Sequence, residues 1–98
     1  MNEIIHQPVR LKIMSALNAL GNKERVDFSR LKSIVSASDG NLGAHIMVLE
    51  KAGYISIEKD FVGRKPRTRV CMTRAGRRAF SQHVTYLREI LEVDNHDE

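Results

Sequence analysis

The amino-acid sequence predicts a small α+β domain that is mainly helical and carries one β-hairpin. Three observations predict it: apolar residues recur at helical spacing through the first half of the chain, the period changes from 3.6 to 2 after Gly53, and helical spacing returns after Thr73. A length of 98 residues supports one modest core, so a single domain over residues 1–98 is expected.

The composition narrows the class of protein. A single cysteine argues against a disulfide framework and fits a reducing cytoplasm. No apolar run approaches the roughly 20 residues that a membrane helix needs. The N-terminal residues lack the basic region and the long apolar stretch of a signal peptide. We therefore expect a soluble, cytoplasmic protein without membrane contact.

The first part of the chain predicts two helices. Ile4 and Ile5 form a short apolar lead-in before Pro8, and proline is favoured in the first turn of a helix. The helix after Pro8 has an apolar face at spacings of four, four and three: Val9, Ile13, Leu17 and Leu20. Asp27 is the expected N-cap of the second helix. Its expected buried stripe consists of Phe28, Leu31, Ile34 and Val35.

A third helix is expected at about residues 38–52. Ser38 is a good N-cap, and Asp39 places a negative charge at the positive end of the helix dipole. The apolar stripe is made by Leu42, Ile46 and Leu49. Gly53 then supplies the left-handed residue that ends the helix. Two short helices joined by a tight turn are the helix-turn-helix arrangement.

The front of this third helix is unusually bare. Away from the stripe its side chains are small or polar: Gly40, Asn41, Gly43, Ala44 and His45. Each glycine inside a helix costs about 1 kcal/mol relative to alanine. We infer that something outside the helix comes close to it.

The segment at about residues 54–73 predicts a basic hairpin. Alternating apolar residues stand on both sides of a loop, D-F-V-G-R-K-P-R, which Gly63 and Pro66 mark. The tip carries Arg64, Lys65 and Arg67. Thr73 is expected to cap a last helix at about residues 74–93.

Positive charge is concentrated in this part of the chain. Residues 59–78 hold eight basic side chains against one acid, whereas the other 78 positions hold eight basic and eleven acidic groups. Such a concentration is typical of a nucleic-acid contact. A solvated charged face is the alternative, although solvated faces usually mix both signs.

The order helix, helix, helix, hairpin, helix is that of a winged helix-turn-helix. Five motifs resemble one family: I-H-Q-P-V-R-L-K-I-M at 5–14, D-G-N-L-G-A-H-I at 39–46, L-E-K-A-G-Y-I at 49–55, G-R-K-P-R-T at 63–68 and M-T-R-A-G-R-R-A-F at 72–80. Over nearly its whole length the chain resembles the small archaeal and bacterial winged-helix transcriptional regulators related to the MarR and ArsR groups. The resemblance implies a dimeric, double-stranded-DNA-binding regulator with its third helix in the major groove and its wing near the minor groove.

Recognition of DNA gives each candidate residue a role. The helix set consists of Ser38, Gly40, Asn41, Gly43, Ala44 and His45, and the wing set of Arg64, Lys65 and Arg67. Asn41 can read adenine, and His45 can donate to a phosphate or a guanine. Each also has a structural alternative, since Asn41 can cap the first turn and His45 can pack on the neighbouring helix. The wing cations are expected on phosphates, which give affinity without sequence information.

Surplus apolar surface predicts a homodimer. The expected interface comprises Ile4, Ile5, Phe80, Val84, Leu87 and Leu91, because the last helix carries more apolar residues than so small a domain readily buries. The alternative is that this helix packs wholly within its own core.

Other chemistry is sparse. No catalytic set, cofactor motif or metal-ligand spacing is present, so we expect neither an enzyme nor a metal protein. His83 with His96 and Asp97 is a weak candidate for a metal, and Cys71 is either an ordinary strand cysteine or a redox sensor. An effector cannot be identified from the sequence. The alternative function is a winged-helix module that binds another protein instead of DNA.

Overall fold

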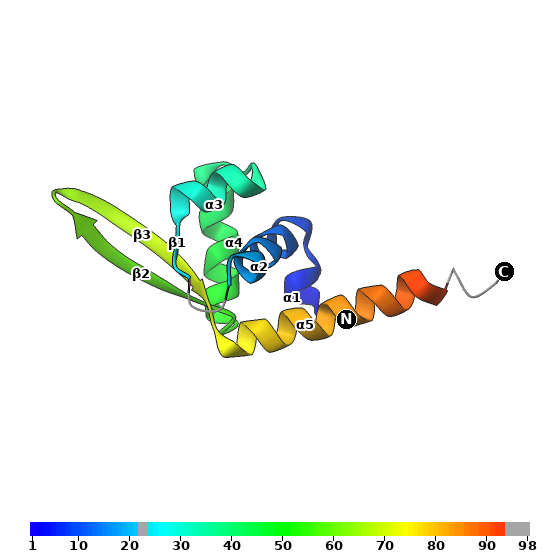
Figure 1. The fold of residues 1–98 in the computed structure, drawn as a ribbon. Coiled ribbons are helices and arrows are strands. Elements are labelled where there is room, and N and C mark those ends of the chain that lie inside the picture. The colour runs from blue at the N-terminus through cyan, green and yellow to red at the C-terminus, as the bar shows by residue number, and fades with distance from the viewer. Residues whose placement is uncertain (22–23, 94–98) are drawn as a thin grey trace.

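The computed structural model describes residues 1–21 and 24–93. These residues form several helices and one small sheet in an elongated molecule of 61 × 25 × 21 Å. The elements in chain order are α1 (Glu3–His6), α2 (Pro8–Leu20), β1 (Val26–Asp27), α3 (Phe28–Val35), α4 (Asp39–Lys51), β2 (Ile55–Val62), β3 (Lys65–Met72) and α5 (Arg74–Val93). Figure 1 shows the β2–β3 hairpin projecting from one side of the helical body and α5 extending from the other. The fold class expected from the sequence, a mainly helical winged helix, is confirmed.

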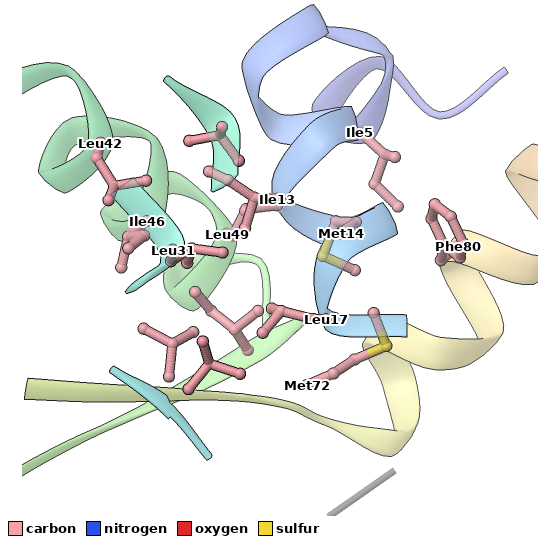
Figure 2. Packing of buried hydrophobic residues seen from close by; sticks show 14 residues of the cluster. Ile5, Ile13, Met14, Leu17, Leu31, Leu42, Ile46, Leu49, Met72 and Phe80 are labelled. Atoms are coloured by element: carbon pink, nitrogen blue, oxygen red, sulfur yellow. The ribbon is translucent and has the colours of Figure 1, made fainter. Parts of the chain in front are cut away.

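The core lies between the helices and the base of the sheet. Apolar side chains from α1 to α5 converge there, as Figure 2 shows. They are Ile5, Ile13, Met14, Leu17, Val26, Leu31, Val35, Leu42, Ile46, Leu49, Ile55, Val70, Met72 and Phe80. Ile34, which was expected in this set, is 48% exposed. The prediction was wrong at this residue because α3 has only eight residues and turns a narrow face to the core.

The apolar lead-in before Pro8 is itself a helix. Asn2 Oδ1 accepts from the backbone amides of Ile4 and Ile5, at 3.0 Å each, and so begins α1. The residue before a proline is restricted to extended conformations, and Gln7 (φ −62°, ψ 132°) ends α1 in that way. The Gln7 side chain then accepts from the Arg10 amide at 2.9 Å and begins α2.

The sheet has a third strand that the sequence did not predict. Antiparallel pairing gives the order β1-β3-β2, with Val26 opposite Val70 and Asp27 opposite Arg69. Two residues are too few to show alternation, so β1 could not be recognised as a strand. Asp27 does stand at the N-cap of α3, but its side chain makes no capping hydrogen bond within the described chain.

The hairpin is longer and its turn tighter than expected. β2 and β3 pair from Ile55–Met72 at the base to Val62–Lys65 at the tip, which leaves only Gly63 and Arg64 in the turn. Gly63 has a φ of +62°, and a glycine with positive φ is typical of two-residue hairpin turns. Pro66 therefore lies inside β3, opposite Phe61. It is tolerated because β1 covers only the far end of β3, so the edge beside Pro66 is open.

Candidate nucleic-acid interface

Helix α4 is fixed by its cap and by one buried face. Ser38 Oγ accepts from the Asn41 amide at 3.3 Å, and Asp39 is paired with Lys32 Nζ of α3 at 2.7 Å. Leu42 and Leu49 are fully buried and Ile46 is 3% exposed. Because all three lie on one side, the opposite side of α4 is turned to solvent.

The candidate helix residues divide between this open face and its two edges. Gly40, Asn41 and Ala44 are exposed, and Ser38 is exposed at the cap. The Asn41 side chain makes no hydrogen bond within the described residues, because Ser38 and not Asn41 caps the first turn. The side-chain carboxamide of Asn41 is therefore free to bind a partner.

Gly43 and His45 lie at the edges of the open face and are half-buried. Gly43 lines a mainly apolar hollow of about 300 Å³ between α4 and the hairpin, together with Phe28, Ile46, Met47, Ile57, Lys59 and Thr68. His45 is on the side of Arg10 in α2. Burial, followed by the positive charge of Arg10, lowers the pKa of His45, so its imidazole is neutral at pH 7.

The glycines of α4 do not make room for any other described part of the chain. A β-carbon added at Gly40 or Gly43 would have no other described atom within 4 Å, apart from its neighbours along the helix. Neither glycine has a positive φ. The fold would therefore accept alanine at both positions, and the small residues keep the outer surface of the helix clear.

Two further residues complete the open face and were missed by the sequence reasoning. Met47 is 68% exposed and Val48 is 38% exposed, three and four positions after Ala44. Both residues could have been predicted from the helical spacing that starts at Gly40 and Ala44. They were overlooked because apolar residues are usually expected in the core. They add apolar surface beside the polar front of the helix. Such surface can contact the methyl group of a thymine.

The hairpin has one face on which charges are paired. Arg67 Nε and Nη2 donate to the two carboxylate oxygens of Asp60 at 2.9 and 2.7 Å. Arg69 Nη2 contacts Glu58 at 3.0 Å and Asp60 at 3.2 Å, and Arg25 Nε lies 2.8 Å from Glu58. The hydrogen bond from Arg67 is the largest cause that lowers the pKa of Asp60.

This network revises the picture of a uniformly basic wing. Arg67 was expected to contact a phosphate, whereas its guanidinium is held by Asp60, the residue directly opposite it in the ladder. Arg64 and Lys65 at the tip are exposed. They make no ion pair within the described chain. Beside them Phe61 and Val62 are 71% and 56% exposed, so the tip presents both charge and apolar surface.

The candidate dimer residues are not all on the surface. Ile5 is fully buried and Phe80 is 8% exposed, and both belong to the core of their own chain. The expectation that they form an interface is corrected, because α1 and the first half of α5 cover each other. Ile4 and Val84 are partly buried against the same core.

Exposure increases toward the end of α5. Leu87 is half-buried, Ile90 is 47% exposed and Leu91 is 67% exposed. This is the part of the helix that extends beyond the body of the molecule in Figure 1. Among the described residues no element covers this apolar end of α5, which leaves it available for a contact with another chain.

Comparison with known proteins agrees with this architecture. Residues 9–91 match the family model described as a winged helix DNA-binding domain. An uncharacterized protein of Methanocaldococcus jannaschii is 32% identical over 96 residues, which cover 98% of each chain.

Two solved structures are similar over nearly the whole chain. The structure of a transcriptional regulator homologue from Pyrococcus horikoshii OT3 has a TM-score of 0.83 and 31% identity, covering 99% of this chain and 91% of the other. A PadR-like transcription factor from Bacteroides fragilis has a TM-score of 0.73 at 18% identity, covering 94% and 93%. The second likeness concerns the fold alone. In the described part of the chain, no helix is long and apolar enough to cross a membrane.

Proposed function

Since this chain belongs to the winged helix DNA-binding domain family, we propose that it is a sequence-specific regulator of transcription that binds double-stranded DNA. In this proposal α4 enters the major groove, and the tip of the β2–β3 hairpin lies on the backbone or in the minor groove. Membership of the family points to a DNA-binding function and not to catalysis.

The observation that carries the proposal is the open face of α4. Gly40, Asn41, Ala44, Met47 and Val48 form a solvent-facing stripe opposite the buried one. A β-carbon at position 40 or 43 would meet no other described part of the chain. A helix that enters the major groove directs its N-terminal residues at base edges, and small residues there allow a close approach. Asn41 is the best placed residue to read a base, because an amide side chain pairs with adenine through two hydrogen bonds.

The hairpin tip supplies the electrostatic part of the proposal. Arg64 and Lys65 are exposed cations that pair with no acid among residues 1–21 and 24–93, whereas Arg67 is engaged by Asp60. We assign phosphate contact to Arg64 and Lys65 first. Arg67 belongs to a network of three arginines and two acids, which as a whole keeps one positive charge. Contacts of this kind raise affinity for any duplex and make it dependent on salt.

A homodimer is the second part of the proposal. We infer that the exposed end of α5, with Leu87, Ile90 and Leu91, pairs with the same surface of a second copy. A symmetric dimer presents two copies of α4 and selects two half-sites of opposite orientation. The single-domain organisation, the MarR- and ArsR-like regulator type and the cytoplasmic location expected from the sequence belong to the same proposal.

A protein-binding module remains the second candidate because of the exposed apolar residues around the site. Met47 on α4 and Phe61 and Val62 on the hairpin tip are more than half exposed. Such surface is also typical of protein contacts. Under this alternative the same face would bind a polypeptide, and the affinity for DNA would be negligible.

One experiment separates the two candidates. Selection of bound sequences from a pool of random duplexes at low salt should recover a pseudo-palindromic site with half-sites one helical turn apart. A variant with Asn41→Ala should lose the base preference at one position of each half-site. Recovery of no enriched sequence, together with no binding of mixed duplex DNA at low salt, would reject the regulator and favour the protein-binding module.

A further inference from the structure

Two histidines that are far apart in the sequence meet where α1 packs against α5. His6 Nδ1 lies 3.4 Å from His83 Nε2. The ring centroids are 5.3 Å apart, and the ring planes are inclined at 82°. His83 is only 2% exposed, whereas His6 is exposed. His83 was expected to be a weak metal candidate together with His96 and Asp97, but these two residues lie outside the described part of the chain.

The two distances of the pair are those expected for two ligands on one tetrahedral ion. Two imidazoles bound to such an ion at 2.0–2.1 Å have ligating nitrogens about 3.4 Å apart and ring centroids about 5.2 Å apart. Both values match the observed arrangement. Without a metal ion the same contact is a hydrogen bond between the two ring nitrogens, and its length of 3.4 Å lies beyond the roughly 2.7–3.2 Å that is usual for N–H donors. Adjacent positions of an octahedral ion would bring the nitrogens to about 3.0 Å.

The buried imidazole also has an unused nitrogen. His83 Nδ1 is buried and has no hydrogen-bond partner among the described residues. A hollow of about 270 Å³ next to His83 is lined by Met1, Asn2, Ala79 and Gln82. Histidines that bind metals usually donate their second N–H to an oxygen of the protein or of a water molecule. The hollow has room for such a water beside the Gln82 amide.

We propose that His6 Nδ1 and His83 Nε2 hold a divalent transition-metal ion with tetrahedral preference, such as Zn²⁺ or Co²⁺, which links α1 to α5. Within residues 1–21 and 24–93, no group of three or more His, Cys, Asp or Glu side chains is placed to hold a metal. The two remaining positions of the ion are therefore taken by water or by another ligand from outside these residues. The site is independent of the DNA-binding proposal, because it lies at the packing of α1 on α5.

The test uses the full chain, freed of metal and without DNA. Titration with Co²⁺ should give one ion per chain and the intense visible absorption of tetrahedral cobalt. In nitrogen NMR spectra, Zn²⁺ should shift the signals of His6 Nδ1 and His83 Nε2, and it should raise the melting temperature. His6→Ala is the diagnostic variant because its side chain is exposed and its loss does not open the core. We expect it to weaken binding at least tenfold and to abolish the rise in melting temperature, whereas the control His45→Ala should bind as the wild type does.

Three outcomes would overturn the proposal. They are the absence of a tetrahedral cobalt spectrum, undiminished binding by His6→Ala, and zinc-dependent NMR shifts confined to other histidines. His83→Ala is a second variant, and its melting temperature without metal shows whether it still folds. If it folds and binds as tightly as the wild type, the proposed site is excluded.

Discussion

Gly76 in the first turn of α5 packs directly against the backbone of Tyr54, at the point where α4 has ended and β2 begins. A β-carbon at Gly76 would overlap the Tyr54 carbonyl group. The same carbonyl oxygen accepts from the Thr73 amide at 3.0 Å. Thr73 Oγ1 donates to the Gly53 carbonyl at 2.6 Å and accepts from the Gly76 amide at 3.0 Å. These contacts fix the start of α5 on the connection between α4 and the hairpin.

Gly76→Ala is therefore expected to destabilise the protein. The added methyl group meets backbone, which cannot move aside as a flexible side chain would, so the free energy of unfolding should fall by about 1–3 kcal/mol or more. Urea denaturation followed by circular dichroism measures this change. An unfolding free energy equal to that of the wild type would show that α5 is not held at Tyr54.

Gly43→Ala should have the opposite effect on stability. An added methyl group meets open space, and alanine is favoured over glycine in a helix by about 1 kcal/mol. We expect a gain in stability of up to about that amount, accompanied by weaker DNA binding, because the methyl group enters the space proposed for the duplex. Fluorescence anisotropy with a selected site measures the affinity. If both Gly43→Ala and Gly40→Ala bind DNA as tightly as the wild type, the glycines do not serve to leave space for the duplex.

The contrast between these glycines shows what the sequence could predict. The stripe of Leu42, Ile46 and Leu49 gave the helix and its buried face, because spacing along one helix is a local property. The requirement for glycine at position 76 was not recognised. It arises from close contact with the backbone of Tyr54, which is 22 positions away in the chain. β1 was missed for the same reason, because its two residues are a strand only beside Val70 and Arg69.

The candidate site was predictable to a similar extent. Gly40, Asn41 and Ala44 were expected to be open, and they are exposed. The pairing of Arg67 with Asp60 and the meeting of His6 with His83 depend on the register of the hairpin and on the docking of α1. Neither follows from spacing along the sequence.

The double variant Arg64→Ala, Lys65→Ala should weaken binding to every duplex and flatten its dependence on salt. Each phosphate contact contributes about −0.9 to the slope of log affinity against log salt, so the slope should become shallower by about 1.8. Anisotropy titrations at several salt concentrations measure it. Arg88→Ala is the control, because Arg88 is an exposed cation on α5, away from the hairpin. An unchanged slope in the double variant would place the tip outside the interface.

DNA binding should respond to pH through His45. Its pKa is lowered from 6.5 by burial and by Arg10, so the folded protein without DNA keeps the ring neutral at pH 7. The unfolded chain binds this proton more readily, and the contribution of His45 to stability is therefore lost as pH falls below about 6.5. A nearby phosphate favours the charged ring, so affinity for DNA should rise as pH falls through the same range.

The measurement for His45 compares wild type with His45→Gln between about pH 7.5 and pH 5.5, a range that spans the ordinary histidine pKa. We expect the rise in affinity in the wild type and a smaller rise or none in the variant. Equal pH profiles would show that His45 packs against α2 without contacting DNA.

Leu91→Glu should convert a dimer into a monomer without unfolding it. Leu91 is 67% exposed near the end of α5, so a charge there costs the isolated chain little, whereas a symmetric interface would bring two carboxylates together. Sedimentation velocity gives the oligomeric state, and circular dichroism gives the helix content. Ser81→Glu, at an exposed position in the first half of α5, is the control and should remain dimeric.

The monomeric variant should bind a two-half-site duplex no better than a single half-site. A wild-type chain that sediments as a monomer at micromolar concentration would contradict the proposed dimer, and a dimeric Leu91→Glu variant would move the interface away from this end of α5.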